Sequence, residues 1–243
     1  MSLERNAYQR CQAFIDSNFV QTRPESRREP LAVTMSREVY SQSHEIAEKL
    51  ITLLQSDSRL GRDKWALFDR DLVQKVLEDH NLPKALARYM PEDKDHDFTG
   101  VINEILGLHP SLWELFHHTC DTIYKLAKVG NVVLIGRGAN IITRRMPHVL
   151  HVRLIAPFEE RVRRAAAQRG ISDHEARRFI RHDDQARAAF VRSHFDEDPE
   201  DPGAYHILLN TGKITPSQAA HMIHAALKQH RVDKPANRAV LMR

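Results

Sequence analysis

The sequence predicts an α/β protein built on a largely parallel sheet of five strands. Five short apolar segments occur along the 243-residue chain, and each is followed by a turn and then by a helical hydrophobic pattern. This order is typical of β-α units, whose strands form a parallel sheet covered by helices on both faces. The predicted strands are residues 31–35, 65–68, 131–135, 149–155 and 205–210.

The segment that precedes the first strand is predicted to be separate from this domain. Apolar residues recur at helical spacing between residues 5 and 19, and the polar stretch 21–30 is typical of a linker. We therefore expect an N-terminal helical arm and linker over residues 1–30. The α/β domain is expected over 31–230, followed by a disordered C-terminal tail over 231–243.

The connections between the strands are predicted to be helical. Helical patterns follow the first two strands, and the region 83–129 is helical throughout. Residues 157–195, between the fourth and fifth strands, form an unusually long helical stretch that is too rich in arginine to be buried without partners. Its position and charge predict a lid over about 157–195.

Composition and charge narrow the class of function. The formal net charge is only +4, no run of eighteen apolar residues occurs, and residues 1–10 lack the apolar core of a signal peptide. We expect a cytoplasmic protein without a membrane segment. Arginines concentrate between residues 137 and 192 without a basic stripe and interleaved aromatics, which favours a local anion site over nucleic-acid binding. The fifteen histidines are scattered, so no metal site is predicted.

Charged residues directly follow three of the predicted strands. Arg37 and Arg137 lie one or two residues beyond their strands, and Asp69, Arg70 and Asp71 follow the second strand. Ligands of an open parallel sheet bind outside the carboxyl ends of the strands. We therefore expect these side chains to converge on one crevice.

Six stretches of the chain resemble, in order and spacing, the cytidylate kinase-like branch of the P-loop nucleoside monophosphate kinases. They are TMSREVYSQSHEIAEKL, FDRDLVQKVLEDH, VVLIGRGANII, HVRLIAPFEERVRR, IRHDDQARAAFVRSHF and YHILLNTG. The resemblance runs from about Ala32 to near Lys228. It implies a five-stranded parallel sheet of adenylate-kinase type, ATP and Mg²⁺ as the phosphoryl donor, and a nucleoside monophosphate such as CMP as the acceptor.

The resemblance also implies roles for individual residues. The ATP-phosphate loop, over residues 36–45, would include Ser36, Arg37, Ser41, Gln42, Ser43 and His44. The acceptor side would comprise Asp69, Arg70, Lys75 and Arg137. The implied catalytic residues are Arg137 and the lid arginines Arg181 and Arg187, and Asn210 and Thr211 would lie near the adenine.

This division of roles agrees with the chemistry of phosphoryl transfer. The reaction needs in-line positioning and positive charge around the equatorial oxygens more than covalent participation by the protein. Arginine presents a planar fork of donors suited to phosphate oxygens, and a closing lid excludes water. The alternative for Arg181 and Arg187 is a solvated helix face that pairs with neighbouring carboxylates.

The phosphate loop departs from the intact motif GxxxxGK[ST]. Arg37, Tyr40 and Gln42 stand where kinases with the intact motif have glycines, and Ser43 stands where they have the lysine. Members of the cytidylate kinase-like branch commonly read SREYGSGGREIA. The second arginine of that stretch is His44 in this chain. Arg37 and His44 could replace the missing lysine, or Tyr40 could occupy the phosphate space.

The amino end of the helix after this loop keeps its unpaired N–H groups, which attract anions without any side chain. Ser41 or Ser43 could cap that helix. Asp69 could equally be a ligand or the cap of the helix that follows the second strand.

Three functions follow from these features. The leading prediction is a nucleoside monophosphate kinase-like protein acting on CMP or dCMP. The alternative is a catalytically impaired sensor module that binds a nucleotide or anion and keeps the kinase fold. A third possibility is an interaction protein that forms homo-oligomers through residues 1–30.

Overall fold

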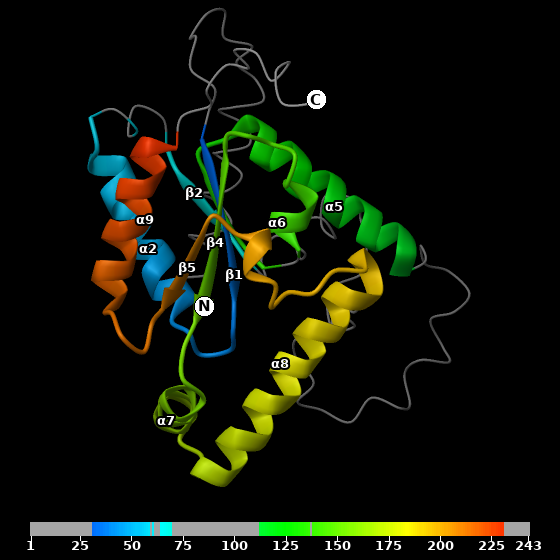
Figure 1. The fold of residues 1–243 in the computed structure, drawn as a ribbon, viewed down its shortest axis with the longest axis vertical. Helices are drawn as coiled ribbons and strands as arrows, with labels where there is room; N and C mark the ends of the chain where they lie inside the picture. The colour runs from blue at the N-terminus through cyan, green and yellow to red at the C-terminus, as the bar shows by residue number, and fades with distance from the viewer. Residues whose placement is uncertain (1–30, 59, 61–63, 70–111, 137, 231–243) are drawn as a thin grey trace, which may run out of the picture.

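The computed structural model describes residues 31–58, 60, 64–69, 112–136 and 138–230. They contain five strands, all parallel, in the order β2-β3-β1-β4-β5 (Figure 1). The strands are β1 Ala32–Arg37, β2 Ala66–Phe68, β3 Val132–Ile135, β4 Val149–Ile155 and β5 Ile207–Asn210. The predicted five-stranded parallel sheet is confirmed. β1 extends two residues beyond its predicted end, so Ser36 and Arg37 belong to the strand.

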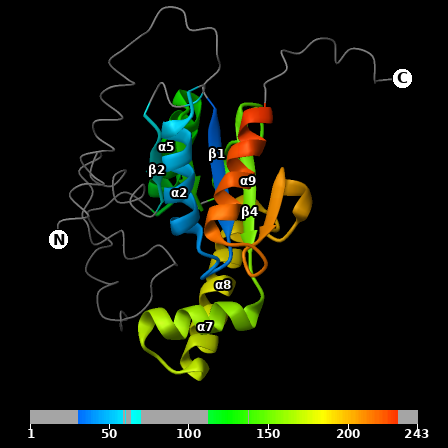
Figure 2. The same ribbon diagram turned by 90° about the vertical axis from the view of Figure 1, so that its left-hand side faces the viewer.

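Helices cover both faces of this sheet, as Figures 1 and 2 show. α2 (Ser43–Ser56) and α9 (Pro216–Gln229) pack on one face, and α5 (Leu112–Val129) and α6 (Ala139–Ile142) lie on the other. The remaining helices are α7 (Phe158–Arg169), α8 (Asp173–Phe195) and the short 3-10 helix η2 (Pro202–Ala204).

The alternation of side chains along β1 and β4 separates two kinds of packing. Met35 and Leu154 point into the apolar core under α2 and α9, where both are fully buried. Successive strand residues point to opposite faces, so Ser36 and Arg153 lie on the other face. That face carries two polar cross-strand pairs, Thr34 with His151 and Ser36 with Arg153.

The long helical stretch predicted over 157–195 is two helices. Gly170 ends α7 in the left-handed conformation, with φ of 66°, and Ser172 begins α8 with a capping box to Glu175. α7 and α8 pack on each other beyond the carboxyl ends of the strands (Figure 1). Val39, from the segment after β1, joins the small apolar cluster between them.

Several predictions concern residues outside the described ranges. They include the N-terminal arm, most of the helical region 83–129, the C-terminal tail, and the candidate site residues Arg70, Lys75 and Arg137. The described ranges contain no helix that is both long and apolar enough to span a bilayer. Homo-oligomerisation and cytoplasmic location remain predictions.

Candidate functional site

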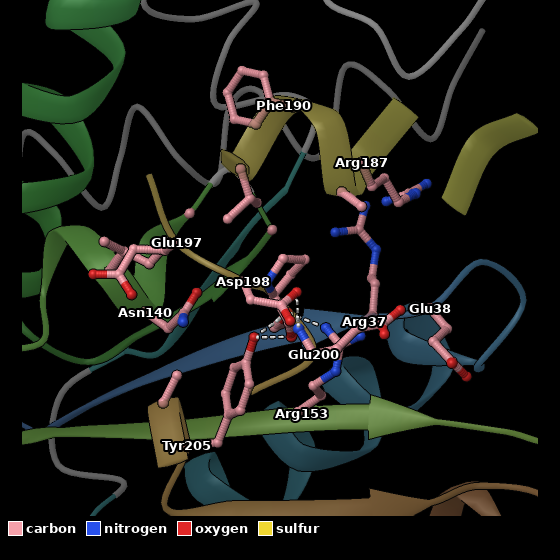
Figure 3. Close-up of a pocket in the computed structure, with 18 of the residues that line it drawn as sticks. Arg37, Glu38, Asn140, Arg153, Arg187, Phe190, Glu197, Asp198, Glu200 and Tyr205 are labelled. Atoms are coloured by element: carbon pink, nitrogen blue, oxygen red, sulfur yellow. Dashed lines mark hydrogen bonds between the residues drawn. The ribbon is translucent and has the colours of Figure 1, made fainter. Parts of the chain in front are cut away.

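Two cavities meet at the carboxyl ends of the strands. The first, of about 160 Å³, lies among β1, β4, the turn after β3, α8 and the segment before β5, and we call it the inner cavity (Figure 3). The second, of about 960 Å³, lies between the amino end of α2 and helices α7 and α8, and we call it the outer groove. Arg37, Glu38 and Arg187 line both. The two spaces are therefore adjacent.

The segment between β1 and α2 has the backbone angles of a glycine-containing loop without any glycine. Tyr40 and Gln42 are left-handed, with φ of 59° and 62°. They stand at two of the positions where kinases with the intact phosphate-loop motif have glycines. A left-handed residue with a side chain costs about 1–2 kcal/mol, so the surrounding structure must hold this conformation in place.

The amino end of α2 differs from the sequence prediction. Its N-cap is Gln42, which makes no side-chain capping bond. Ser43 is the first helical residue, and the Ser41 hydroxyl donates instead to the carbonyl of Glu38 (2.8 Å). The prediction that one of these serines caps α2 is therefore wrong. An uncapped helix amino end beside the outer groove remains suited to an anion.

Carboxylates within the protein fasten this loop to α7 and α8. The Val39 N–H donates to Asp184 Oδ1 (3.0 Å), and Arg161 Nη1 donates to the second oxygen of Asp184. Arg161 Nε also lies 3.5 Å from Glu38 Oε2, an oxygen that accepts from the Ala156 N–H (2.8 Å). The buried Arg161 therefore has two carboxylate partners, and an internal carboxylate holds the Val39 N–H.

Tyr40 belongs to the same attachment. Its ring packs edge-on against Phe179, with ring centroids 6.1 Å apart, and its hydroxyl accepts from Arg169 Nε (2.7 Å). Its carbonyl accepts from Arg164 Nη1 (3.2 Å). The side chain thus lies against α7 and α8, at the wall of the outer groove.

The two candidate substitutes for the missing lysine have different surroundings. His44 Nε2 lies 2.8 Å from Asp69 Oδ2, which joins a predicted donor-side residue to a predicted acceptor-side residue. Arg37 extends across the turn after β3, where its Nη1 would lie 2.3 Å from a Cβ added to Gly136. Arg37 therefore reaches the inner cavity, whereas His44 lines the outer groove.

The turn after β3 needs both of its glycines. Gly136 and Gly138 are left-handed, with φ of 78° and 67°. The Arg37 guanidinium fills the space beside Gly136, and the Phe195 ring of α8 fills the space beside Gly138. These glycines allow β1 and α8 to approach the turn that carries residue 137.

The inner cavity contains a buried arginine that the sequence prediction missed. Arg153 of β4 is 6% exposed and lies directly opposite Ser36 of β1. Its Nη1 donates to Ser36 Oγ (2.9 Å), and its guanidinium lies 5.6 Å from the centroid of the Tyr205 ring. Figure 3 shows Arg153 and Tyr205 on the same side of the cavity. The available signal was an arginine inside the predicted strand VLHVRLI, in which every other residue except His151 is apolar.

The predicted lid arginines occupy different places. Arg187 lines both cavities and lies 3.9 Å from Asp183 Oδ2. The Arg181 guanidinium lies 5.3 Å from the centroid of the Phe158 ring, and this residue lines neither cavity. Of the two, the structure brings only Arg187 to the strand ends.

The predicted adenine-side residues lie at the end of β5 and in the turn that follows it. Asn210 Oδ1 accepts from the Gly212 N–H (3.0 Å), and the Thr211 hydroxyl donates to the carbonyl of Ile155 (3.2 Å). Arg164 Nη2 donates to the Thr211 carbonyl (2.8 Å). Because Arg164 also binds the Tyr40 carbonyl, one side chain joins this turn to the phosphate loop.

Comparisons with known proteins bear on the family and the fold of the chain. The model of the cytidylate kinase-like family matches residues 32–213. An uncharacterized protein from Eubacterium ventriosum has a similar structure, with a TM-score of 0.60 and 16% identity over 82% of this chain and 98% of that chain. No curated protein matches the sequence significantly.

Two shikimate kinases show weaker structural similarity. The enzyme from Bacteroides thetaiotaomicron has a TM-score of 0.47 and 13% identity over 82% of this chain and 98% of its own. The enzyme from Acinetobacter baumannii, in complex with shikimate, has a TM-score of 0.46 and 14% identity, over 84% of this chain and 96% of its own. The match of the family model covers most of the residues, including every strand, and the chain therefore belongs to the cytidylate kinase-like family.

Proposed function

We propose that the protein transfers the terminal phosphoryl group of Mg·ATP to a nucleoside monophosphate, with CMP or dCMP as the first candidates. The observation that carries this proposal is the junction of the outer groove and the inner cavity at Arg37 and Arg187. One space lies beside a helix amino end suited to the ATP phosphates, and the other is lined by arginines suited to an acceptor phosphate.

On the donor side, the loop and the amino end of α2 would bind the ATP phosphates. The left-handed angles of Tyr40 and Gln42 support this, because they hold the loop in a shape that normally needs glycine. Arg164 would position the adenine side, since it contacts both the Tyr40 and Thr211 carbonyls. Asn210 and Thr211 would then lie near the base.

At the junction, Arg37 and Arg187 would stabilise the charge on the transferred group. An oxygen of the acceptor phosphate attacks the γ-phosphorus, the bond to the β–γ bridging oxygen breaks, and ADP leaves. Removing one donor that stabilises such charge typically costs about 2.7–4 kcal/mol, or roughly a hundredfold to a thousandfold in rate.

Mg²⁺ would arrive with the nucleotide. The described residues contain no group of three histidine, cysteine or acidic side chains arranged to hold a metal. Mg²⁺ is commonly held by substrate phosphates with one or two carboxylates, and Glu45, Asp69 and Asp183 line the outer groove. These residues fit a metal carried by ATP, whose chemistry is to neutralise phosphate charge.

The test is ADP formation from Mg·ATP across a panel of nucleoside monophosphates, with wild-type protein, Arg187→Ala and Arg163→Ala. Arg163 is the matched control, because it is an exposed arginine of α7 paired with Glu160. We expect turnover that depends on one acceptor, falls about a hundredfold or more in Arg187→Ala, and persists in Arg163→Ala. No turnover with any acceptor would refute the enzymatic proposal.

A second candidate function is a nucleotide or anion sensor that no longer transfers phosphate. The lack of a lysine and the engagement of the Val39 N–H by Asp184 favour it. Calorimetry distinguishes the two functions. A monophosphate that binds without forming ADP in the presence of Mg·ATP would support the sensor.

A further inference from the structure

Arg153 carries a positive charge into the interior of the sheet. It is buried, with 6% of its surface exposed, and it lies at the wall of the inner cavity. Burying a charge is unfavourable unless an opposite charge or a full set of hydrogen bonds compensates it. The partners of Arg153 therefore decide what this side chain does.

The hydroxyl groups beside Arg153 form a chain that ends on a carbonyl. The Tyr205 hydroxyl donates to the Pro199 carbonyl (2.8 Å), because a carbonyl can only accept. Ser36 Oγ lies 3.2 Å from the Tyr205 oxygen and accepts from Arg153. Both hydroxyls are thereby satisfied, and only one of the five guanidinium N–H groups is used.

The carboxylates of the cavity wall have other partners. Asp184 and Glu38 pair with Arg161, Glu197 pairs with Arg144, and Asp198 pairs with Arg192. Glu200 is exposed at the rim. Among the described residues, no carboxylate lies within 4 Å of the Arg153 guanidinium.

We propose that Arg153 is the base of an anion subsite that binds a phosphate group in the inner cavity. The cavity volume of about 160 Å³ is close to that of an engineered protein cavity that holds a benzene molecule, so a phosphate fits. Arg37 and Arg187 face the same space and add positive charge. The proposal deepens the proposed function and rests on it only for the identity of the phosphate as that of the acceptor nucleotide.

Ser36 and Tyr205 are positioning residues for this subsite. The register of β1 and β4 sets Ser36 opposite Arg153, and the segment before β5 brings the Tyr205 ring alongside the guanidinium. These contacts fix the plane of the guanidinium without neutralising it. Its remaining donors stay available to a phosphate.

The experiment measures thermal unfolding of the full chain with increasing inorganic phosphate, at ionic strength held constant with chloride. The variants are wild type, Arg153→Met, Arg153→Lys and the exposed control Arg163→Met. We expect phosphate to raise the Tm of wild type and Arg163→Met. Arg153→Met should weaken phosphate binding at least about tenfold, the loss expected for a hydrogen bond to a charged group, and Arg153→Lys should be intermediate.

Calorimetry with CMP and cytidine identifies the source of the phosphate. Binding of CMP but not cytidine, with loss of CMP affinity in Arg153→Met, places the nucleotide phosphate at Arg153. Binding of inorganic phosphate alone supports the subsite and assigns it to a free anion. Equal phosphate protection in wild type and Arg153→Met, or no protection in wild type, overturns the proposal.

If Arg153→Met fails to fold, the phosphate affinities of Arg153→Lys and Ser36→Ala test the proposal instead. Ser36→Ala keeps the charge but removes the contact that orients the guanidinium, so phosphate affinity should fall severalfold. Unchanged affinity in both variants also overturns the proposal. Phosphate binding at Arg153 without any turnover would refute the kinase activity and leave the subsite intact.

Discussion

Arg153 and Arg161 have the same exposure, 6%, and opposite surroundings. Arg161 lies between Asp184 and Glu38, and it also donates to backbone carbonyls. Arg153 contacts one hydroxyl and one aromatic ring. The first arginine is neutralised by the protein and fastens the phosphate loop to α7 and α8. The second lacks such a partner, which is the condition expected of a residue that recognises an anion.

His151 shows a third way to accommodate a basic side chain. It lies two residues before Arg153 on the same sheet face, with its Nδ1 2.8 Å from the Thr34 hydroxyl. Burial, followed by the charges of His206 and His230, lowers the pKa of His151 to about 4. This side chain therefore remains neutral at physiological pH, an option that arginine does not have.

Of the four predictions, Arg161→Met is expected to lower the free energy of unfolding the most. The change leaves Asp184 and Glu38 without their shared cation, and breaking a buried pair in this way typically costs about 3–5 kcal/mol. We expect about 3 kcal/mol, because Asp184 and Glu38 are partly exposed. Urea unfolding measures the loss, and Arg163→Met should change stability little. An equally small change in Arg161→Met would contradict the structural role of Arg161.

The second prediction concerns pH. Because the folded-state pKa of His151 is depressed, its contribution is fully present above the unfolded value of about 6.5 and is lost as the pH falls through about 4. The difference between these two pKa values corresponds to roughly 3 kcal/mol in the free energy of unfolding. We expect the free energy of unfolding to decrease over this range in wild type, and to decrease less in His151→Gln. The exposed control His221→Gln should behave as wild type.

The third prediction concerns the loop that Arg161 holds. Gln42→Gly removes the strain of a left-handed residue and keeps an acceptable N-cap, so stability should rise by about 1 kcal/mol. Gln42→Val should lower the Tm, because a β-branched residue is poorly tolerated at positive φ. Thermal unfolding of both variants measures the difference. A lower Tm for Gln42→Gly would argue against the strained conformation.

The smallest expected effect is that of Arg153→Met on the protein without anions. Replacing an uncompensated buried charge by an apolar side chain of similar length should change the free energy of unfolding by less than about 1 kcal/mol, or increase it. Urea unfolding in chloride buffer, beside Arg161→Met, is the measurement. A loss as large as that of Arg161→Met would make Arg153 a structural residue and remove the contrast between the two arginines.

The sequence was informative where local patterns decide the structure. Short apolar runs such as VVLI, followed by turns, identified every strand of the sheet, because burial on both faces requires continuous apolar segments. The ordered stretches also identified the family. Gly170, which divides the predicted lid into two helices, was visible as a residue but was not recognised as a helix end.

The candidate site was less predictable, because its residues depend on contacts between distant segments. Arg187 was predicted and lines both cavities, but Arg181 lines neither. Asp184 is one of the carboxylates near Arg181 and Arg187 in the sequence, and in the structure it accepts from the Val39 N–H of the loop. Arg153 received no role, since an arginine inside a strand gives no local indication of its partners.

The sequence by itself determined the five strands and their order along the chain, and the departure from the glycine motif. Only the tertiary structure decided which arginines are neutralised. Ser36 and Arg153 are separated by 117 positions along the chain, yet they lie opposite each other because β1 and β4 pair in parallel. A buried charge is compensated by groups that lie within a few ångströms of it. The fold decides which groups those are, because residues far apart in the sequence can be neighbours in space.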